Sequence, residues 1–466
     1  MKPVLHRLSI SPVVLALAFA LAIPRPASPQ APVRVPQDVP ARYHPLPPIR
    51  EQAKEMQTWV EARLTRVLPA LMAEHGADMW ILSMREYAED PVFWSMISET
   101  TFAARRRSIY VFTRKPDGTV ERLALGGGSQ GGLFQIYRSP HPTPTGRQAE
   151  LWGDEQWRLL REIVADRSPG TIVLNIDDTW AWADGLGAGE REALDRALGP
   201  EYLGRVKRVP QLAVDYVAVR VPEMLPRYRE MQETVHAIIS EAFSNSVITP
   251  GVTTTEDVVW WLRQRVSDLG FESWFQPSVG VQRAGQNPPE EGAVVIQRGD
   301  MIWTDFGVVG MRLKTDTQHN GYILREGETD VPEGLRKCLA TSNRMQDIQV
   351  EELKPGRTGN EALAAALVRM KQEGITGSLY SHPIGDHGHG AGPLIGLWDR
   401  QEGVPGRGDG KIRPSTWFSI ELQATVPVPE WGGKPVNCRQ EEDVWLDAEG
   451  TRHWVFRRQE KFHLVW

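Results

Sequence analysis

Two aspartates stand inside the most strand-like stretch of this chain, GDMIWTDFGVVGMRLKTDTQ, which runs from Gly299 to Gln318. The apolar residues around them predict a hairpin, and a turn at Gly310-Met311 would place Asp305 directly across from Asp316. Directly opposed residues have Cβ atoms about 4.5–5.5 Å apart, and like charges at that spacing destabilise a sheet. A cation between the two carboxylates would convert the repulsion into ligation. The pair therefore predicts either the solvent-exposed edge of a hairpin or a metal site.

Two later strands each carry an acid in the same unusual setting. The alternation of STWFSIELQATV places Glu421 on the polar face of a strand whose other face is apolar. In NCRQEEDVWLD, Glu441 shares one strand face with Arg439 and Asp443. Acids within sequences that otherwise favour strands support a metal site over a solvent-exposed hairpin edge, because each acid adds an oxygen ligand.

A histidine completes the donor set. In GDHGHGAGPLIG, His389 lies between two glycines, which let the backbone approach a ligand closely, and imidazole is the commonest nitrogen ligand. The predicted metal ligands are Asp305, Asp316, His389, Glu421 and Glu441. This oxygen-rich set suits two divalent ions, with Mn²⁺ first and Co²⁺ or Zn²⁺ as alternatives, and does not suit a closed structural zinc site.

The order of these motifs resembles the pita-bread metallopeptidases, which include methionine aminopeptidase, aminopeptidase P and prolidase, together with the related creatinases. The matching phrases are RGDMIWTDFG, TDTQ, HGHGAG, WFSIEL and RQEEDVWLDAEG. MAEHGADMWILSMREYAEDPVFW, nearer the amino terminus, resembles the small first domain of the prolidase and aminopeptidase P branch. The resemblance implies a small α/β amino-terminal domain followed by an α+β pita-bread catalytic domain.

The resemblance also implies roles for the five ligands. Asp305 would chelate one ion, Asp316 and Glu441 would bridge both, and His389 and Glu421 would bind the other. The implied reaction is hydrolysis of a peptide bond next to proline, as in an Xaa-Pro aminopeptidase or dipeptidase. Glu421 would relay a proton from the activated water to the leaving nitrogen.

The chain departs from the family pattern at two histidines. The family has a histidine in the strand before the first metal aspartate, where this chain reads AGQNPPEEGAVVIQRGD. It also has a histidine and an acid seven and eight residues after the metal histidine, where counting from His389 gives Gly396 and Leu397. His387 and His382 are the catalytic candidates that could substitute for the missing pair.

Composition and periodicity divide the chain into four parts. We expect a signal peptide over 1–31, a proline-rich linker over 32–48, the first domain over 49–214 and the catalytic domain over 215–466. Apolar spacing predicts long helices over about 222–243, 333–352 and 359–373.

The first residues have the features of an export signal. Lys2 and Arg7 precede a continuous apolar run of 11 residues from Val13 to Ile23, which is too short to span a bilayer comfortably. Cleavage is expected near Ala27 or Ala31, so the protein would be secreted or periplasmic, with an uncleaved anchor as the alternative. No later segment has the length of a membrane span.

Several alternatives remain open at the level of sequence. The net charge of −6 gives no reason to expect nucleic acid as a partner, and the expected substrate is a peptide or a small amide. Cys338 and Cys438 could pair in an exported protein or stay free and buried. The chain could instead be a metal-dependent amidohydrolase acting on a small non-peptide amide, or an inactive relative that binds peptides. A homodimer, which relatives often form, is also open.

Overall fold

The computed structural model describes residue 36 and residues 38–137, 153–285 and 292–466. The expected signal peptide, the start of the linker and the Asn287-Pro288-Pro289 stretch lie outside the described residues. The described part of the linker has no helix or strand up to Pro48, and it lies along helix α6 (Leu225–Ala242). The backbone N–H of Arg42 donates to Glu233, and that of His44 to Thr234.

The first domain is built on one mixed sheet with strand order β4-β3-β2-β1-β5-β6. Its strands are β1 (Met79–Arg85), β2 (Arg107–Arg114), β3 (Val120–Leu125), β4 (Gln135–Ile136), β5 (Ile172–Leu174) and β6 (Val206–Lys207). β1 pairs antiparallel with β2 and parallel with β5, so helical crossovers are required on the parallel side.

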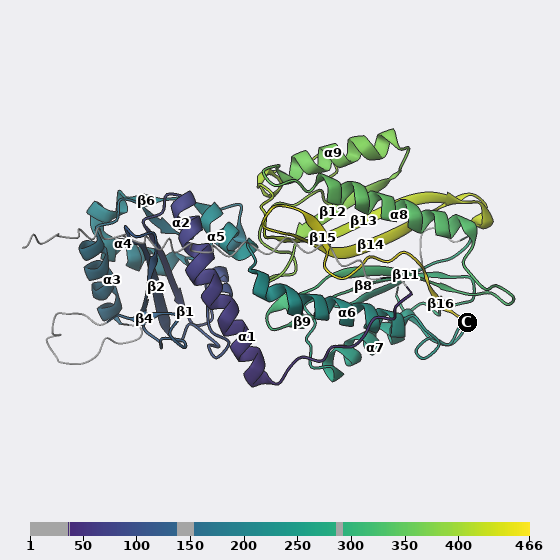
Figure 1. Ribbon diagram of the computed structural model, residues 1–466, viewed down its shortest axis with the longest axis horizontal. Coiled ribbons are helices and arrows are strands. Elements are labelled where there is room, and N and C mark those ends of the chain that lie inside the picture. Colours follow the sequence, from purple (N-terminus) through teal and green to yellow (C-terminus); the bar gives the residue numbers. More distant parts are fainter. Residues whose placement is uncertain (1–35, 37, 138–152, 286–291) are drawn as a thin grey trace, which may run out of the picture. The chain divides into compact units, whose positions relative to one another are not determined.

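Helices cover both faces of this sheet (Figure 1). They are α1 (Ile49–Ala62), α2 (Leu68–Glu74), α3 (Asp154–Arg167), α4 (Ala188–Leu203) and α5 (Pro210–Ala218), with a π-helical turn at Arg63–Val67 between α1 and α2. Alternate residues of β1 enter different cores, because side chains of a strand point to opposite faces. Trp80 packs in the cluster that contains α2 and α5, and Ile81 in the cluster that contains α3 and α4. α5 crosses the expected domain limit at 214.

The second domain contains a large sheet with strand order β12-β13-β14-β11-β8-β7. Its strands are β7 (Ser278–Gln282), β8 (Met301–Phe306), β11 (Thr317–Ile323), β12 (Gly377–Pro383), β13 (Trp417–Val428) and β14 (Lys434–Leu446), with β15 (Arg452–Trp454) paired to β14 and β16 (His463–Val465) paired to β11. β9 (Val309–Gly310) and β10 (Leu313–Lys314) form a short separate ribbon. β14 joins β11 at a single residue pair, so the sheet has two halves that meet there.

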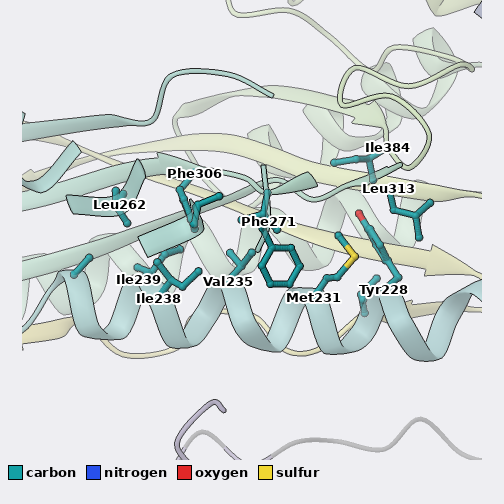
Figure 2. Packing of buried hydrophobic residues seen from close by; sticks show 14 of the residues in the cluster. Tyr228, Met231, Val235, Ile238, Ile239, Leu262, Phe271, Phe306, Leu313 and Ile384 are labelled. Atoms are coloured by element: carbon teal, nitrogen blue, oxygen red, sulfur yellow. The ribbon is translucent and has the colours of Figure 1, made fainter. Parts of the chain in front are cut away.

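Each half of this sheet has its own pair of helices (Figure 1). α6 and α7 (Thr255–Asp268) pack with the β8 half, whereas α8 (Glu333–Glu352) and α9 (Gly359–Gln372) pack with β12 and β13. The helices expected over 222–243, 333–352 and 359–373 are confirmed. Figure 2 shows Tyr228, Met231 and Val235 of α6 in the apolar cluster that also contains Phe271 and Phe306. Among the described residues, no helix is both long enough and apolar enough to cross a membrane.

The register expected for the aspartate hairpin is wrong by two residues. Asp305 lies directly across from Gln318 and not from Asp316. The turn falls at Met311-Arg312, both in the left-handed region (φ 51° and 67°), as a two-residue hairpin turn requires. The guanidinium of Arg312 donates to the carbonyls of Ile97 and Ser98, which holds this unfavourable conformation in place.

Candidate metal centre

The four predicted acids converge through strand register. Glu421 on β13 pairs with Glu441 on β14, Glu441 pairs with Gln318 on β11, and Gln318 pairs with Asp305 on β8. These residues therefore form one row across four strands, and directly paired residues share a face. Asp316, two residues before Gln318, lies diagonally from Asp305 on that face.

Two groups of ligand atoms result, each with all its atoms within 4.8 Å of one another. Asp305, Glu421 and Glu441 form one group, and Asp316, His382 and Glu441 form the other. Glu441 belongs to both, so its carboxylate is placed to bridge two positions. Four of the five predicted ligands are thus brought together, and His389 is not in either group.

The carboxylates repel one another and are poorly solvated. Burial, followed by repulsion from Glu441, raises the pKa of Asp305, Asp316 and Glu421 well above the ordinary value. Burial raises the pKa of Glu441 to about 7. Arg439 lowers the pKa of Asp305 and Glu421, but by less than burial raises it. The described protein groups therefore leave an excess of negative charge that a bound cation would neutralise.

His382 presents a nitrogen lone pair to these carboxylates. Its Nδ1 lies 3.0 Å from the carbonyl oxygen of Pro383, which can only accept, so Nδ1 carries the proton. Nε2 is then an acceptor, and it has no hydrogen-bond partner within the described residues although His382 is fully buried. It lies 3.3 Å from Glu441 Oε1 and 3.8 Å from Asp316 Oδ2. Either a proton or a metal cation must lie between three such acceptors, and a ligating histidine characteristically donates its other N–H in this way.

His389 lies next to His382. Its position in the sequence matches that of the second histidine in the family pattern. It follows His382 by seven residues. Its ring centroid is 4.8 Å from that of His382 and 5.5 Å from that of Trp274, both edge-on. Burial lowers its pKa to about 4, so the ring is neutral at neutral pH. The family pattern has a second histidine seven residues after the metal histidine. If His382 is the metal ligand, His389 is that second histidine, and only the acid that follows it in the pattern is replaced, by Gly390.

The loop between these two histidines is held by Asp386. Its two oxygens lie 2.7 Å from Arg63 and 3.0 Å from Arg220, and these cations hold its pKa well below the usual range despite burial. His387, the other catalytic candidate, is in neither ligand group. It lines a pocket of about 380 Å³ together with Lys314, and burial lowers its pKa to about 4.

Gln318 is a site residue that sequence reasoning missed. Its Nε2 donates to Glu421 (2.6 Å) and to Glu441 (2.9 Å), and its Oε1 accepts from the indole N–H of Trp303 (3.0 Å). The indole fixes the amide orientation, so the donor side must face the acids. A correct hairpin register would have revealed it, because Gln318 is the direct neighbour of both Asp305 and Glu441.

Comparison with known proteins identifies the domain that holds this site. Residues 226–448 match the model of metallopeptidase family M24. The part of the chain that holds the candidate site is therefore similar to metallopeptidase family M24. All four clustered acids and His382 lie within the matched range, and no match was found among curated proteins.

Solved structures extend the likeness to most of the chain. An X-Pro aminopeptidase from Thermotoga maritima is 16% identical, with a TM-score of 0.58, and covers 85% of this chain and 100% of its own. An Xaa-Pro dipeptidase from Bacillus anthracis is 15% identical, with a TM-score of 0.57, and covers 90% of this chain and 100% of its own. The N-terminal domain of FACT complex subunit SPT16 from Cicer arietinum (chickpea) also matches, at 12% identity and a TM-score of 0.52, and covers 86% and 96%.

These comparisons confirm the fold predicted from sequence, an α/β first domain followed by a pita-bread domain. The M24 match confirms the predicted class, a metallopeptidase. The third neighbour shows that the fold also occurs in a protein that is not named as a peptidase. The substrate must therefore be argued from the site.

Proposed function

We propose that this protein is an exported, dinuclear metal-dependent peptidase that hydrolyses a peptide bond next to proline. The observation that carries the proposal is the buried lone pair of His382 Nε2 facing the carboxylates of Glu441 and Asp316. That arrangement is unfavourable in a folded protein unless a cation occupies it.

The residues present fit two divalent ions. Asp305, Asp316, Glu421 and Glu441 would supply oxygen atoms and His382 would supply one nitrogen, and Glu441 belongs to both groups of ligand atoms. His382 takes the ligand position that the sequence motif assigned to His389. The set is rich in oxygen, as Mn²⁺ prefers, with Co²⁺ or Zn²⁺ as alternatives.

Two such ions supply a Lewis acid for the scissile carbonyl and a water nucleophile with a pKa near 7. The protein contributes position and proton transfer. Glu421 accepts a proton from the nucleophile and passes it to the leaving nitrogen, because its carboxylate lies at the edge of the row of acids, next to Tyr380 on β12. Neutral His389, held against Trp274, is placed to donate a hydrogen bond to the substrate carbonyl.

Specificity for proline is supported by the two solved neighbours named for Xaa-Pro substrates, which align along their whole length. Export is supported by the amino-terminal sequence. Mass analysis of the protein from a natural host would test it, since cleavage near Ala27 or Ala31 gives a distinct mature mass and an intact amino terminus would contradict export.

The direct test of activity uses the chain stripped of metal by a chelator. Adding Mn²⁺ should restore hydrolysis of an Xaa-Pro dipeptide or of a longer peptide with proline second, and should leave a matched Xaa-Ala peptide largely intact. Metal binding without cleavage of any peptide would support an amidohydrolase or a peptide-binding relative instead. Failure to bind metal would contradict the proposal outright.

A further inference from the structure

Three histidines and one glutamate meet on the other side of β14. His236 comes from α6, His319 from β11, Glu442 from β14 and His463 from β16. His236 Nε2 lies 2.9 Å from Glu442 Oε2, and His319 Nε2 lies 2.8 Å from Glu442 Oε1. Four elements that are distant in sequence thus converge on one carboxylate, and His236, His319 and Glu442 are at most 3% exposed.

This cluster is distinct from the peptidase centre. Glu441 and Glu442 are neighbours on one strand, so their side chains point to opposite faces. Glu441 contacts Ser419 and Gln318, whereas Glu442 contacts the two histidines and the backbone N–H of Gln459. The two glutamates share no hydrogen-bond partner.

The hydrogen bonds of His319 have the arrangement found at metal-bound histidines. Glu442 can only accept, so His319 donates from Nε2, and its Nδ1 accepts from His463 Nε2 at 3.1 Å. If a cation replaced the Nε2 proton, His319 would carry a proton on Nδ1 and donate it to His463 Nε2, and His463 would then carry its own proton on Nδ1. A metal-bound histidine typically has such a partner on its second nitrogen. Metal binding at His319 Nε2 would therefore leave the number of protons on these two rings unchanged.

Two of the three imidazoles in this cluster are in the neutral form. Burial lowers the pKa of His319 and lowers that of His463 further, so both rings are neutral at neutral pH. Two imidazoles and a carboxylate are the protein ligands of several open zinc sites.

The cluster is accessible from solvent. A pocket of about 600 Å³ is lined by His236, His319 and His463, together with Tyr43, Arg457 and Lys461. An ion can enter by this route, and a water or small anion from the pocket can complete its coordination. The cationic side chains at the wall favour an anionic fourth ligand.

We propose that His236, His319 and Glu442 bind a single transition-metal ion that prefers nitrogen ligands, such as Zn²⁺, with His463 holding His319 in place. Ligand separations across a tetrahedral zinc are about 3.3 Å, given metal–ligand distances of about 2.0–2.2 Å. Each ring must therefore retreat from Glu442 by roughly half an ångström. The ion would link α6, β11 and β14 and thereby stabilise the junction between the two halves of the large sheet.

The experiment uses the full chain carrying Asp316→Asn, which disables the peptidase centre. After chelation and dialysis against Zn²⁺, we expect about one tightly held zinc per chain, and X-ray absorption at the zinc edge should show two imidazole ligands. The peptidase centre offers only one imidazole, so zinc remaining there would give a different spectrum. No retained zinc, or zinc with fewer than two imidazoles, would overturn the proposal.

Matched variants sharpen the assignment. Adding His236→Gln should abolish the two-imidazole signal. Adding His453→Gln should not, although His453 Nε2 also pairs with a carboxylate, Asp447, at 2.9 Å. Equal loss in both would overturn the assignment. Should His236→Gln prevent folding, the absorption spectrum of the Asp316→Asn chain still decides.

Discussion

Glu441 and Glu442 are adjacent residues with nearly identical burial, each 1% exposed, yet their pKa values shift in opposite directions. Burial raises the pKa of Glu441 to about 7, and hydrogen bonds from Ser419 and Gln318 offset only part of that rise. At Glu442 burial acts in the same direction, but His236 and His319 bring the pKa to about 2. Burial alone thus does not determine the charge of a carboxylate. The partners on each face of β14 do: Glu441 receives too few hydrogen bonds to offset its burial, whereas two histidines and a backbone N–H hold the carboxylate of Glu442.

The largest effect should follow removal of an acid from the Glu441 face. Asp316→Asn should keep the fold and lose the metal pair, and turnover should fall more than about 10⁴-fold, because both the nucleophile and the acid–base groups depend on the ions. Metal content and peptide hydrolysis measure this. Retention of both ions with normal turnover would show that Asp316 is not a ligand.

The two histidines on this face should behave differently. His382→Ala should lose metal together with activity. His389→Ala should retain metal while turnover falls about 10²-fold, as for loss of one catalytic hydrogen bond. Metal analysis of the purified variants separates the two, and loss of metal only from His389→Ala would restore the motif-based assignment.

The opposite acidities of the two glutamates predict opposite pH dependences in the metal-free chain. An ordinary glutamate has a pKa of about 4.3. The raised pKa of Glu441 means that the free energy of unfolding falls as pH rises from about 4.3 to about 7. The lowered pKa of Glu442 means that its stabilisation is complete above about 4.3 and is lost as pH falls toward about 2.

Denaturant titrations of two variants test these slopes. Glu441→Gln should flatten the dependence above pH 4.3, and Glu442→Gln the dependence below it, each by an amount on the order of 3–4 kcal/mol. Stability that changes with pH in the same way in both variants would contradict the comparison. Saturating Mn²⁺ should also remove the upper slope in the unmodified chain.

The smallest effect is expected at Gln318. Gln318→Leu removes the N–H donors that hold Glu421 and Glu441 in place, so Mn²⁺ affinity should fall about 10–100-fold with the ligands unchanged. Calorimetric titration measures the affinity. An unchanged affinity would mean that the ions themselves are sufficient to orient the acids.

The sequence was sufficient for the main helices and for the four acids that the structure brings together. Apolar spacing located α8 and α9, and an acid within a strand of alternating polarity located Glu421 and Glu441, because both signals are local. The hairpin register was missed because Met311 and Arg312 adopt left-handed conformations that normally favour glycine or asparagine.

The remaining differences between prediction and structure concern contacts that no local pattern encodes. Glycines on both sides made His389 the more attractive ligand, although a proline follows His382 and its carbonyl fixes the ligand tautomer. The sequence alone does not identify Gln318 as a site residue, because its place in a row of acids follows only from the pairing of four strands. The cluster around Glu442 draws on four elements and is visible only in three dimensions.

The most direct test of the peptidase centre is anomalous scattering from crystals grown with Mn²⁺. We predict two manganese peaks on one side of Glu441, contacted by Asp305, Asp316, His382, Glu421 and Glu441, with the ring of His389 next to them but unbound. The absence of manganese at these acids, or a peak coordinated by His389 while His382 is free, would contradict the account.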